Sequence, residues 1–231
     1  MVILIIVNLV ATMRNQSTIY FMQYNVGRPD LSSAMLTLPN LFMVISLVLS
    51  PLISKKMGKR NAALLGFGIS ALGCLLVVFA GANVPLLFAG SIVLTMGFGI
   101  PFGVIGAMFA DTVDYIEWKS GVRSTGLVYS ATTVSIKMGQ GLGGALGAAL
   151  LALGHYVPNV VQSASSLAAI KFSFSWAALI GIVIGGALLL FYPVDKLYPT
   201  ILAELNARRD AAAPADQGQE NQVTSGTTPA Q

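Results

Sequence analysis

The sequence predicts an all-α polytopic membrane protein with six transmembrane helices. The first observation is composition: 55% of the 231 residues are hydrophobic and 10% are charged, whereas an average soluble domain has about 25% charged residues. A chain so poor in charge cannot cover a water-exposed surface, which excludes most soluble enzymes and nucleic-acid-binding proteins. The second observation is a series of long apolar stretches, rich in Gly and Ala and without the period-two alternation of membrane β-strands.

The six predicted spans follow from their length. A bilayer core about 30 Å thick needs about 20 apolar residues in a helix. The first stretch lacks the basic region and small-residue cleavage site of a signal peptide, so we assign it to the first span. Six stretches, some with polar interruptions, form one predicted bundle over residues 1–192: 1–25, 33–53, 62–81, 86–109, 124–153 and 170–192.

The connectors between the spans predict the orientation. Basic residues gather after spans two, four and six, whereas the alternate connectors hold Arg28, with Lys171 at a span edge. This positive-inside bias predicts that both termini are cytoplasmic, in the inner membrane. The net charge of +4 therefore reflects membrane orientation, and we expect no nucleic-acid partner. The residues that create the bias are Lys55, Lys56, Lys59, Arg60, Lys119, Arg123, Lys196, Arg208 and Arg209.

The C-terminal segment divides in two. Residues 193–209 carry Leu197, Ile201 and Leu205 at helical spacing, which predicts a short amphipathic helix at the cytoplasmic membrane surface. Residues 210–231 are rich in Ala, Gln, Thr and Pro and have no periodic apolar face, which predicts a disordered tail.

Span five carries a charged residue, Lys137, near its middle. A charge at the bilayer centre costs about 2.5–3.5 kcal/mol on insertion scales, so it usually faces a cavity or a partner. Helical spacing places Thr133, Ser130 and Gln140 on the face of Lys137, which predicts the wall of a water-accessible cavity. The alternative is that Lys137 packs against a neighbouring helix. The predicted cavity residues of this span are Tyr129, Ser130, Thr132, Thr133, Lys137 and Gln140.

Span one repeats this polar pattern. Asn8, Thr12 and Asn15 form one face, and Arg14 begins a broadly polar second half that includes Tyr20. Amide and hydroxyl groups with interspersed aromatic rings suit a polyol, because they offer donors, acceptors and an apolar stacking face. We therefore place Asn8, Arg14, Asn15 and Tyr20 in the predicted cavity. The alternative is that this half of the span emerges into water.

Small residues have a different meaning. Glycines at four-residue intervals let membrane helices approach closely, so we expect the two glycine rows to be packing ridges. Pro101 and four glycines in residues 97–106 predict a kink or a flexible point in span four. The GQGLGG segment has the G-x-G-x-x-G spacing but follows no strand, which excludes a dinucleotide site. The two rows are Gly139, Gly143, Gly147 and Gly181, Gly185.

Three acidic residues lie close together after span four. Asp111, Asp114 and Glu117 share roughly one helical face, beside Lys119 and Arg123 in a predicted cytoplasmic loop. No histidine or further carboxylate completes a metal site. We expect an interhelical salt-bridge network, a device that can lock one conformation of a transporter.

Three segments carry a family resemblance: ADTVDYIEWKSGVRSTGLVYSATTVSIKMGQGLGGALG, RNQSTIYFMQYNVG and YPVDKLYPTILAELNARR. They strongly resemble the glycoside–pentoside–hexuronide:cation symporters, a branch of the major facilitator superfamily. The resemblance covers residues 1–209 and is most specific in A-D-x-V-D-Y-x-E-W-K. It implies that the chain is the C-terminal half of such a symporter, one six-helix bundle of a major facilitator fold.

The resemblance also implies roles. Lys137 and Thr133 match family positions at or near the cation and sugar sites between the two bundles. Asp111, Asp114, Glu117 and Arg123 match charges that help to hold the bundles together on the inner side. The coupling cation, Na⁺ or H⁺, is expected to take its acidic ligands from an N-terminal six-helix partner, with no metal site in this chain alone.

The expected function is secondary active transport of a sugar or glycoside coupled to Na⁺ or H⁺, with this chain supplying the C-terminal half. Lipid, sugar and the N-terminal half are the expected partners, without a resident cofactor. The alternative is a non-transporting truncated fragment or scaffold. A membrane enzyme would need a convergent catalytic set, and the spans contain none, so we expect no enzymatic activity.

Overall fold

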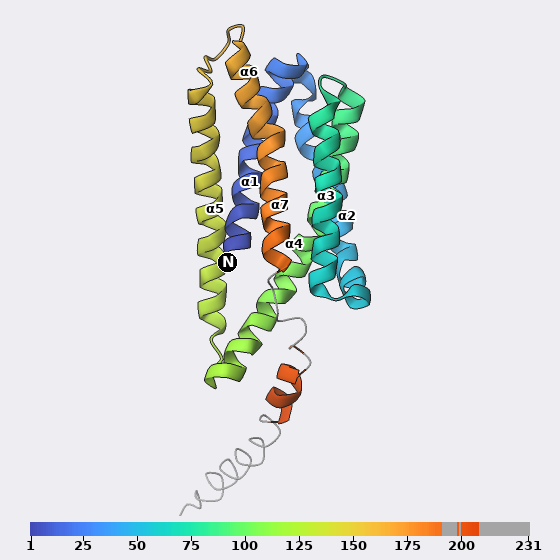
Figure 1. The fold of residues 1–231 in the computed structure, drawn as a ribbon, viewed down its shortest axis with the longest axis vertical. Coiled ribbons are helices and arrows are strands. Elements are labelled where there is room, and N and C mark those ends of the chain that lie inside the picture. Colours follow the sequence, from blue (N-terminus) through green and yellow to red (C-terminus); the bar gives the residue numbers. More distant parts are fainter. Residues whose placement is uncertain (191–197, 199, 208–231) are drawn as a thin grey trace, which may run out of the picture.

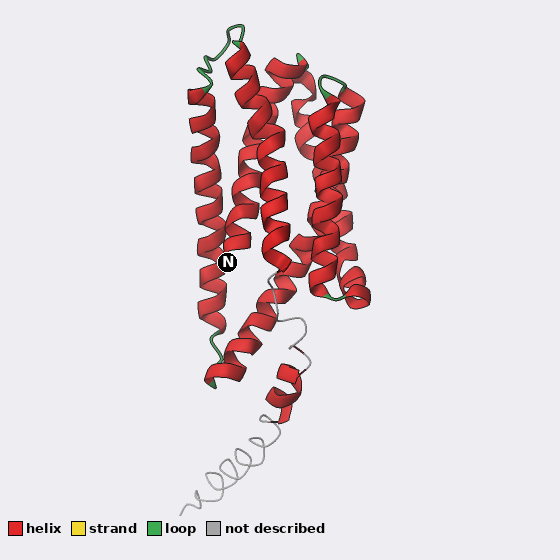
Figure 2. Ribbon diagram, in the orientation of Figure 1, coloured by secondary structure: helices red, strands yellow, loops and turns green. Residues whose placement is uncertain are grey.

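The computed structural model is a bundle of six helices that are long and apolar enough to cross a membrane (Figure 1). It describes residues 1–190, 198 and 200–207. Within these ranges the chain is helical apart from short turns and the longer connector 154–163 (Figure 2). The predicted all-α, six-span fold is therefore confirmed. The spans are Val2–Val26, Pro29–Met57, Lys59–Ala80, Val84–Ser120, Thr125–Leu153 and Ala164–Leu190.

Two of the spans contain π-helical segments. The first span consists of α1 (Val2–Tyr20) followed by the π segment Phe21–Val26. The last consists of α6 (Ala164–Lys171), the π segment Phe172–Trp176 and α7 (Ala177–Leu190). The two π segments meet through the rings of Phe21 and Phe174, whose centroids lie 4.3 Å apart. The other four spans contain α2 (Ser32–Met57), α3 (Lys59–Ala80), α4 (Val84–Ser120) and α5 (Thr125–Leu153).

The main hydrophobic core lies among α1, α3, α4 and α7. Its buried members include Val10 of α1, Phe67 of α3, Leu94 of α4 and Ile182 of α7. Neither α2 nor α5 contributes a fully buried residue to this cluster. Only 17% of the apolar window of each of these two helices is buried, against 39–50% for the other four spans. Most of the surface of α2 and α5 is therefore not covered by the other described helices.

The glycine row of α5 is the contact surface for α1. A Cβ atom at Gly139 would lie 2.5 Å from the carbonyl oxygen of Ile5, and one at Gly143 would collide with the backbone of Leu9. Gly181 of α7 meets Val10 of α1 in the same way. Because only a hydrogen atom fits at Gly139, Gly143 and Gly181, the predicted ridges are confirmed at these points, whereas a Cβ atom at Gly185 would lie at an ordinary contact distance of 3.4 Å from Phe67.

The glycines around Pro101 are also close contacts. Gly97 meets Ser70 of α3, and Gly99 meets Met43 and Ser46 of α2. The first half of α4 is therefore fixed between two helices, whereas its second half runs obliquely below the bundle (Figure 1). The expectation is a kink or a flexible point: the change in direction of α4 agrees with a kink (Figure 1), whereas tight packing at Gly97 and Gly99 argues against flexibility at these two positions.

The predicted loop after span four is wrong in its conformation. Helix α4 continues to Ser120, so the acidic residues 111, 114 and 117 lie on a helix that projects beyond the bundle. The helical segment 200–207 lies beneath this projection (Figure 1). Its Ile201 and Leu205 are buried, 1% and 3% exposed, so the apolar stripe packs on protein. Leu197 and the predicted disordered tail, 210–231, lie outside the described residues.

Candidate functional site

A cavity of about 220 Å³ lies among α1, α2, α4 and α7. Three amide side chains, Asn8, Asn15 and Asn40, share its wall with Arg14 and Thr95. The rest of the lining is apolar and comes from Val7, Val10, Ala11, Met43, Leu94, Phe98, Phe102, Ala178 and Ile182. An apolar cavity with a few convergent polar groups is the usual form of a small-molecule site.

The hydrogen bonds of two of the cavity amides, Asn8 and Asn40, leave the amide oxygens as acceptors. Asn8 Nδ2 donates to Leu4 O at 2.9 Å, and Asn40 Nδ2 donates to Leu36 O at 2.5 Å. Because a backbone carbonyl can only accept, each amide must turn its nitrogen to its own helix. The two amide oxygens therefore remain as acceptors for a hydroxyl group.

Arg14 is held between two helices at the cavity. Its Nη2 donates to Ser91 Oγ of α4 at 2.9 Å, and its guanidinium carbon lies 4.7 Å from the centroid of the Phe174 ring. Its Nε is buried and has no hydrogen-bond partner among the described residues. The alternative that this part of span one emerges into water does not apply to Arg14, which lies inside the bundle.

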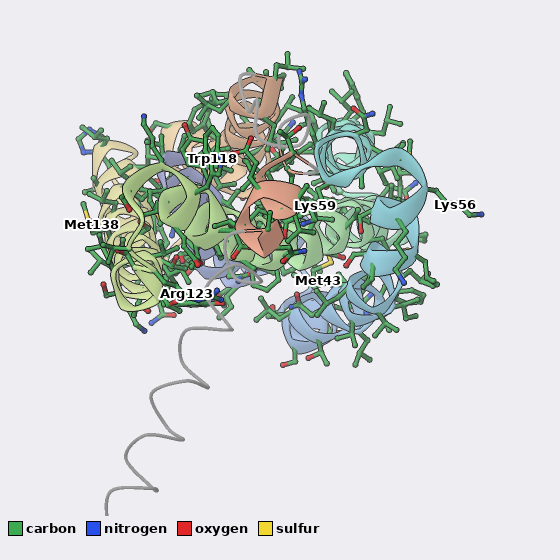
Figure 3. The ribbon with its side chains drawn as sticks, turned by 90° about the horizontal axis from the view of Figure 1, so that it is seen from below. Met43, Lys56, Lys59, Trp118, Arg123 and Met138 are labelled. Atoms are coloured by element: carbon green, nitrogen blue, oxygen red, sulfur yellow. The ribbon has the colours of Figure 1, made fainter. Side chains whose placement is uncertain are left out.

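The exposed surface of α5 has a polar and an apolar side. On one side of the glycine row lie Thr133, Lys137 and Gln140, all exposed. On the other side lie Val134, Met138 and Leu142, which are 56%, 51% and 46% exposed. Figure 3 shows Met138 at the outer edge of the bundle. A lipid-facing helix would be apolar on both sides, so this pattern indicates two different surroundings.

The polar side of α5 lies on the same side of the bundle as the cavity amides. Helices α1 and α5 run in the same direction, side by side (Figure 1). The glycine row of α5 includes Gly139, where a Cβ atom would lie 2.8 Å from Cβ of Asn8. With both helices turning 100° per residue, Thr133 and Gln140 continue the surface that begins with Asn8 and Asn15 on α1.

Lys137 has few contacts in this chain. Its Nζ lies 3.5 Å from Gln140 Oε1, and no ion pair with it is formed among the described residues. Thr133 Oγ1 donates to Tyr129 O and Ser130 Oγ donates to Leu127 O, each at 3.0 Å. These hydroxyls keep their lone pairs for other partners. Within the described residues no neighbouring helix supplies a partner for Lys137 beyond its own helix, so the alternative of packing against another helix of this bundle has no support.

Two predicted cavity residues lie elsewhere. Thr132 is 8% exposed, faces α1 and donates to Val128 O, because one residue turns the helix by 100° from Thr133. Tyr20 packs edge-on against Tyr156, with ring centroids 5.2 Å apart, and lines a groove between α1 and α5. Neither side chain reaches the cavity of Arg14.

The predicted salt-bridge network exists and lies within this chain. Lys59 of α3 pairs with Asp111 of α4 at 2.6 Å. Arg123 pairs with Glu117 at 3.1 Å and lies 3.9 Å from Asp114. The family resemblance implied that Asp111, Asp114, Glu117 and Arg123 join two bundles, whereas these contacts tie α4 to α3 and to the turn before α5. Figure 3, seen from below, shows Lys56 pointing outward, away from the bundle.

The C-terminal segment joins the same network. Tyr198 Oη donates to Asp114 Oδ2 at 3.2 Å, and Lys59 Nζ lies 4.7 Å from the Tyr198 ring centroid. Trp118 Nε1 donates to Glu204 Oε2 at 2.6 Å. Loss of solvent, together with the neighbouring Asp111 and Asp114, raises the pKa of Tyr198 to about 12. The tyrosine therefore stays protonated and can donate to Asp114.

Several residues of the site were missed from the sequence. Asn40 and Thr95 give a weak signal, since each is a polar residue inside an apolar span. Lys59 was counted with the orientation charges, although it is the partner of a buried carboxylate. Phe174 gives no signal, because an aromatic residue in a membrane span is ordinary.

Comparisons with known proteins identify the family. The isoprimeverose transporter of Lactiplantibacillus pentosus is 40% identical over 84% of this chain and 41% of the relative. The putative sulfoquinovose importer of Escherichia coli strain K12 is 31% identical over 83% of the chain and 42% of the relative. The glucuronide carrier protein homolog of the same strain is 29% identical over 84% and 43%. The chain thus spans about two fifths of the length of these relatives.

The names of these relatives are those of transporters, and none is that of an enzyme. A family model described as MFS/sugar transport protein matches residues 1–196, which contain the whole six-helix bundle. This multi-pass membrane protein therefore belongs to the MFS/sugar transport protein family.

Proposed function

We propose that this chain is the C-terminal half of a cation-coupled symporter for a sugar or glycoside. The observation that carries the proposal is the polar, exposed side of α5, with Lys137 near its middle. A charged side chain facing lipid costs about 2.5–3.5 kcal/mol. A second bundle that covers this side and supplies a counter-charge removes the cost. The relatives are longer than this chain, which covers 41–43% of them, so their remaining length is sufficient for a second bundle.

The substrate is proposed from the chemistry of the cavity. Free amide oxygens accept hydrogen bonds from hydroxyl groups, and the apolar wall, including Phe98 and Phe102, suits the C–H face of a sugar ring. The sugar transport named for the family agrees with this chemistry. A glycoside, pentoside or hexuronide is therefore the proposed substrate class, bound between this chain and an N-terminal six-helix half.

The coupling is proposed to act through Lys137. An acidic residue of the facing bundle can pair with the Lys137 ammonium group or with Na⁺ or H⁺, but the two positive species compete for one carboxylate. Binding of the cation would free Lys137 to donate to a sugar hydroxyl, so each ligand would strengthen binding of the other.

The proposed location is the inner membrane with both termini cytoplasmic, since the basic residues gather at one end of the bundle.

The experiment joins this chain to the part of the isoprimeverose transporter that lies outside the matched region and reconstitutes the product in liposomes. Uptake of labelled isoprimeverose, a neutral hexoside and a hexuronide is measured with a Na⁺ gradient, a pH gradient or no gradient. We expect accumulation of at least one sugar under one gradient, and none with the 231-residue chain alone.

Two results would overturn the proposal. Robust gradient-driven uptake by the chain alone would remove the need for a second half. Failure of a co-purified, folded assembly to accumulate any of the three sugars would instead favour the non-transporting fragment or scaffold. Co-purification of the two halves on an affinity tag is measured first, so that a failure to assemble is not mistaken for a failure to transport.

A further inference from the structure

The charges of the described chain leave Arg14 without an acidic partner. Asp30 pairs with Arg28 at 2.8 Å, Asp111 with Lys59 at 2.6 Å, and Glu117 with Arg123 at 3.1 Å. Asp114 accepts from Tyr198 and lies 3.9 Å from Arg123. All of these carboxylates lie at the two ends of the bundle, whereas Arg14 lies inside α1, at the wall of the cavity.

Structural contacts use only part of the Arg14 guanidinium. A single hydrogen bond, to the neutral Ser91 hydroxyl, and the stacking on Phe174 are its interactions in the described chain. A guanidinium has five N–H donors and stays charged in proteins. Arg14 is half-buried, with its Nε enclosed and without a hydrogen-bond partner among the described residues. A partly desolvated charge without an opposite charge is unfavourable, so this arrangement suits an anion that enters and leaves.

The other polar groups of the cavity define what else that anion carries. The amide oxygens of Asn8 and Asn40 are free acceptors, because their nitrogens donate to backbone carbonyls. Thr95 Oγ1 donates to Pro39 O at 2.7 Å, so its proton is also used. The cavity therefore offers acceptors for hydroxyl groups and one cationic fork. A neutral sugar can accept hydrogen bonds from this fork, but only an acidic sugar also supplies the opposite charge.

We propose that the transported substrate is a sugar acid whose carboxylate or sulfonate pairs with Arg14, while its hydroxyl groups donate to Asn8 and Asn40. This inference rests on the proposed transport function and narrows its substrate class. Arg14 forms two parallel N–H···O bonds to a carboxylate, or to two oxygens of a sulfonate, because its planar fork matches their spacing. Ser91 and Phe174 hold the guanidinium at the cavity wall.

The test compares three sugars that differ at one carbon: methyl β-glucoside, methyl β-glucuronide and the corresponding 6-sulfonate. Binding to the purified two-half assembly is measured as the rise in the midpoint of thermal unfolding at increasing sugar concentration, which requires no transport. We expect one or both acids to bind more tightly than the glucoside, and the stronger of the two identifies the acidic group.

Variants separate recognition from structural support. Arg14→Gln is expected to weaken binding of the preferred acid by about ten- to a hundredfold, the size of a lost hydrogen bond to a charged group, and to leave the glucoside unchanged. Arg14→Lys should fall between these, because a point charge replaces the fork. Lys171→Gln removes a positive charge at a span edge outside the cavity and is the matched control.

Two results would overturn the inference. One is equal binding of the three sugars by the unmodified assembly. The other is an Arg14→Gln variant that weakens all three by the same factor, which would make Arg14 a packing residue. Acid-selective, Arg14-dependent binding without uptake of any sugar would support the inference and count against transport, so the two proposals can fail separately.

Discussion

Lys59 of α3 donates to both carboxylate oxygens of Asp111 of α4 at 2.6 Å. The Asp111 side chain is 3% exposed, and that of Lys59 is 27% exposed. The pair fixes the point at which α4 leaves the bundle, and Tyr198 covers it from below. This buried pair contrasts with the Arg123 pairs at the same end, in which the arginine is 56% exposed.

We expect Lys59→Met to lower the stability by about 3 kcal/mol, because it leaves a buried carboxylate without its counter-charge. The matched change at the exposed pair, Arg123→Met, should cost less than about 1 kcal/mol. Adding Asp111→Asn to Lys59→Met should restore part of the loss. The measurement is thermal unfolding in detergent, followed by a thiol-reactive dye at Cys74, which is buried and is the single cysteine of the chain. Equal effects of the two single changes would contradict the contrast in burial.

Gly143→Val is expected to separate α1 from α5. A Cβ atom at Gly143 would collide with the backbone of Leu9, which cannot move like the end of a flexible side chain. Overpacking of this kind costs about 1–3 kcal/mol. The control is Gly141→Val on the same helix, since no atom lies within 4 Å of the Cβ position at Gly141. The midpoint of thermal unfolding is measured for both variants. Equal midpoints would show that the close contact at Gly143 does not contribute to stability.

Lys137→Leu in the two-half assembly should abolish cation-driven sugar uptake. The lysine is exposed on the polar side of α5, so its loss leaves the packing of this chain intact. The stability of the isolated chain in lipid should therefore stay the same or rise, since a charge has left the membrane. Lys56→Leu, at an exposed position beyond the bundle (Figure 3), is the control. Normal coupling in the Lys137 variant would remove this residue from the transport mechanism.

The Tyr198 interaction predicts a dependence on alkaline pH. The pKa of Tyr198 is raised from 10.0 to about 12, with loss of solvent as the main cause and Asp111 and Asp114 as further causes. The folded state therefore keeps a proton that the unfolded state loses. The stabilisation is complete below pH 10 and is lost as the pH rises toward 12.

Ultraviolet titration of tyrosinate measures this effect. The component with a midpoint near pH 12 should disappear in Tyr198→Phe and remain in Tyr129→Phe, which changes an exposed tyrosine of α5. Burial and the neighbouring Tyr24 also raise the pKa of Tyr156, so its late titration remains in both variants. An unchanged amplitude near pH 12 in Tyr198→Phe would show that Tyr198 does not dock on α4 in solution.

Local properties of the sequence predicted much of the site. Lys137, Thr133 and Gln140 share a surface because helical periodicity depends only on residue number. Arg14 was found because a charge in an apolar span needs a special environment. Neither argument could predict that Thr132 lies outside the cavity. The position of Thr132 depends on which face of α5 packs on α1, and this face is set by the tertiary structure.

The sequence by itself determined the six helices, the glycine ridges and the two intramembrane charges, because hydropathy, helical period and side-chain size are local properties. Only the tertiary structure decided which charges are matched. Lys59 and Asp111 are 52 residues apart, and their pairing depends on how α3 and α4 pack. The same packing places Arg14 against a hydroxyl group and an aromatic ring, at a cavity whose wall also carries amide side chains. Electrostatic energy depends on distance in space. A sequence can therefore show that a charge in a membrane span is energetically unfavourable, but not which group lies close enough to compensate it.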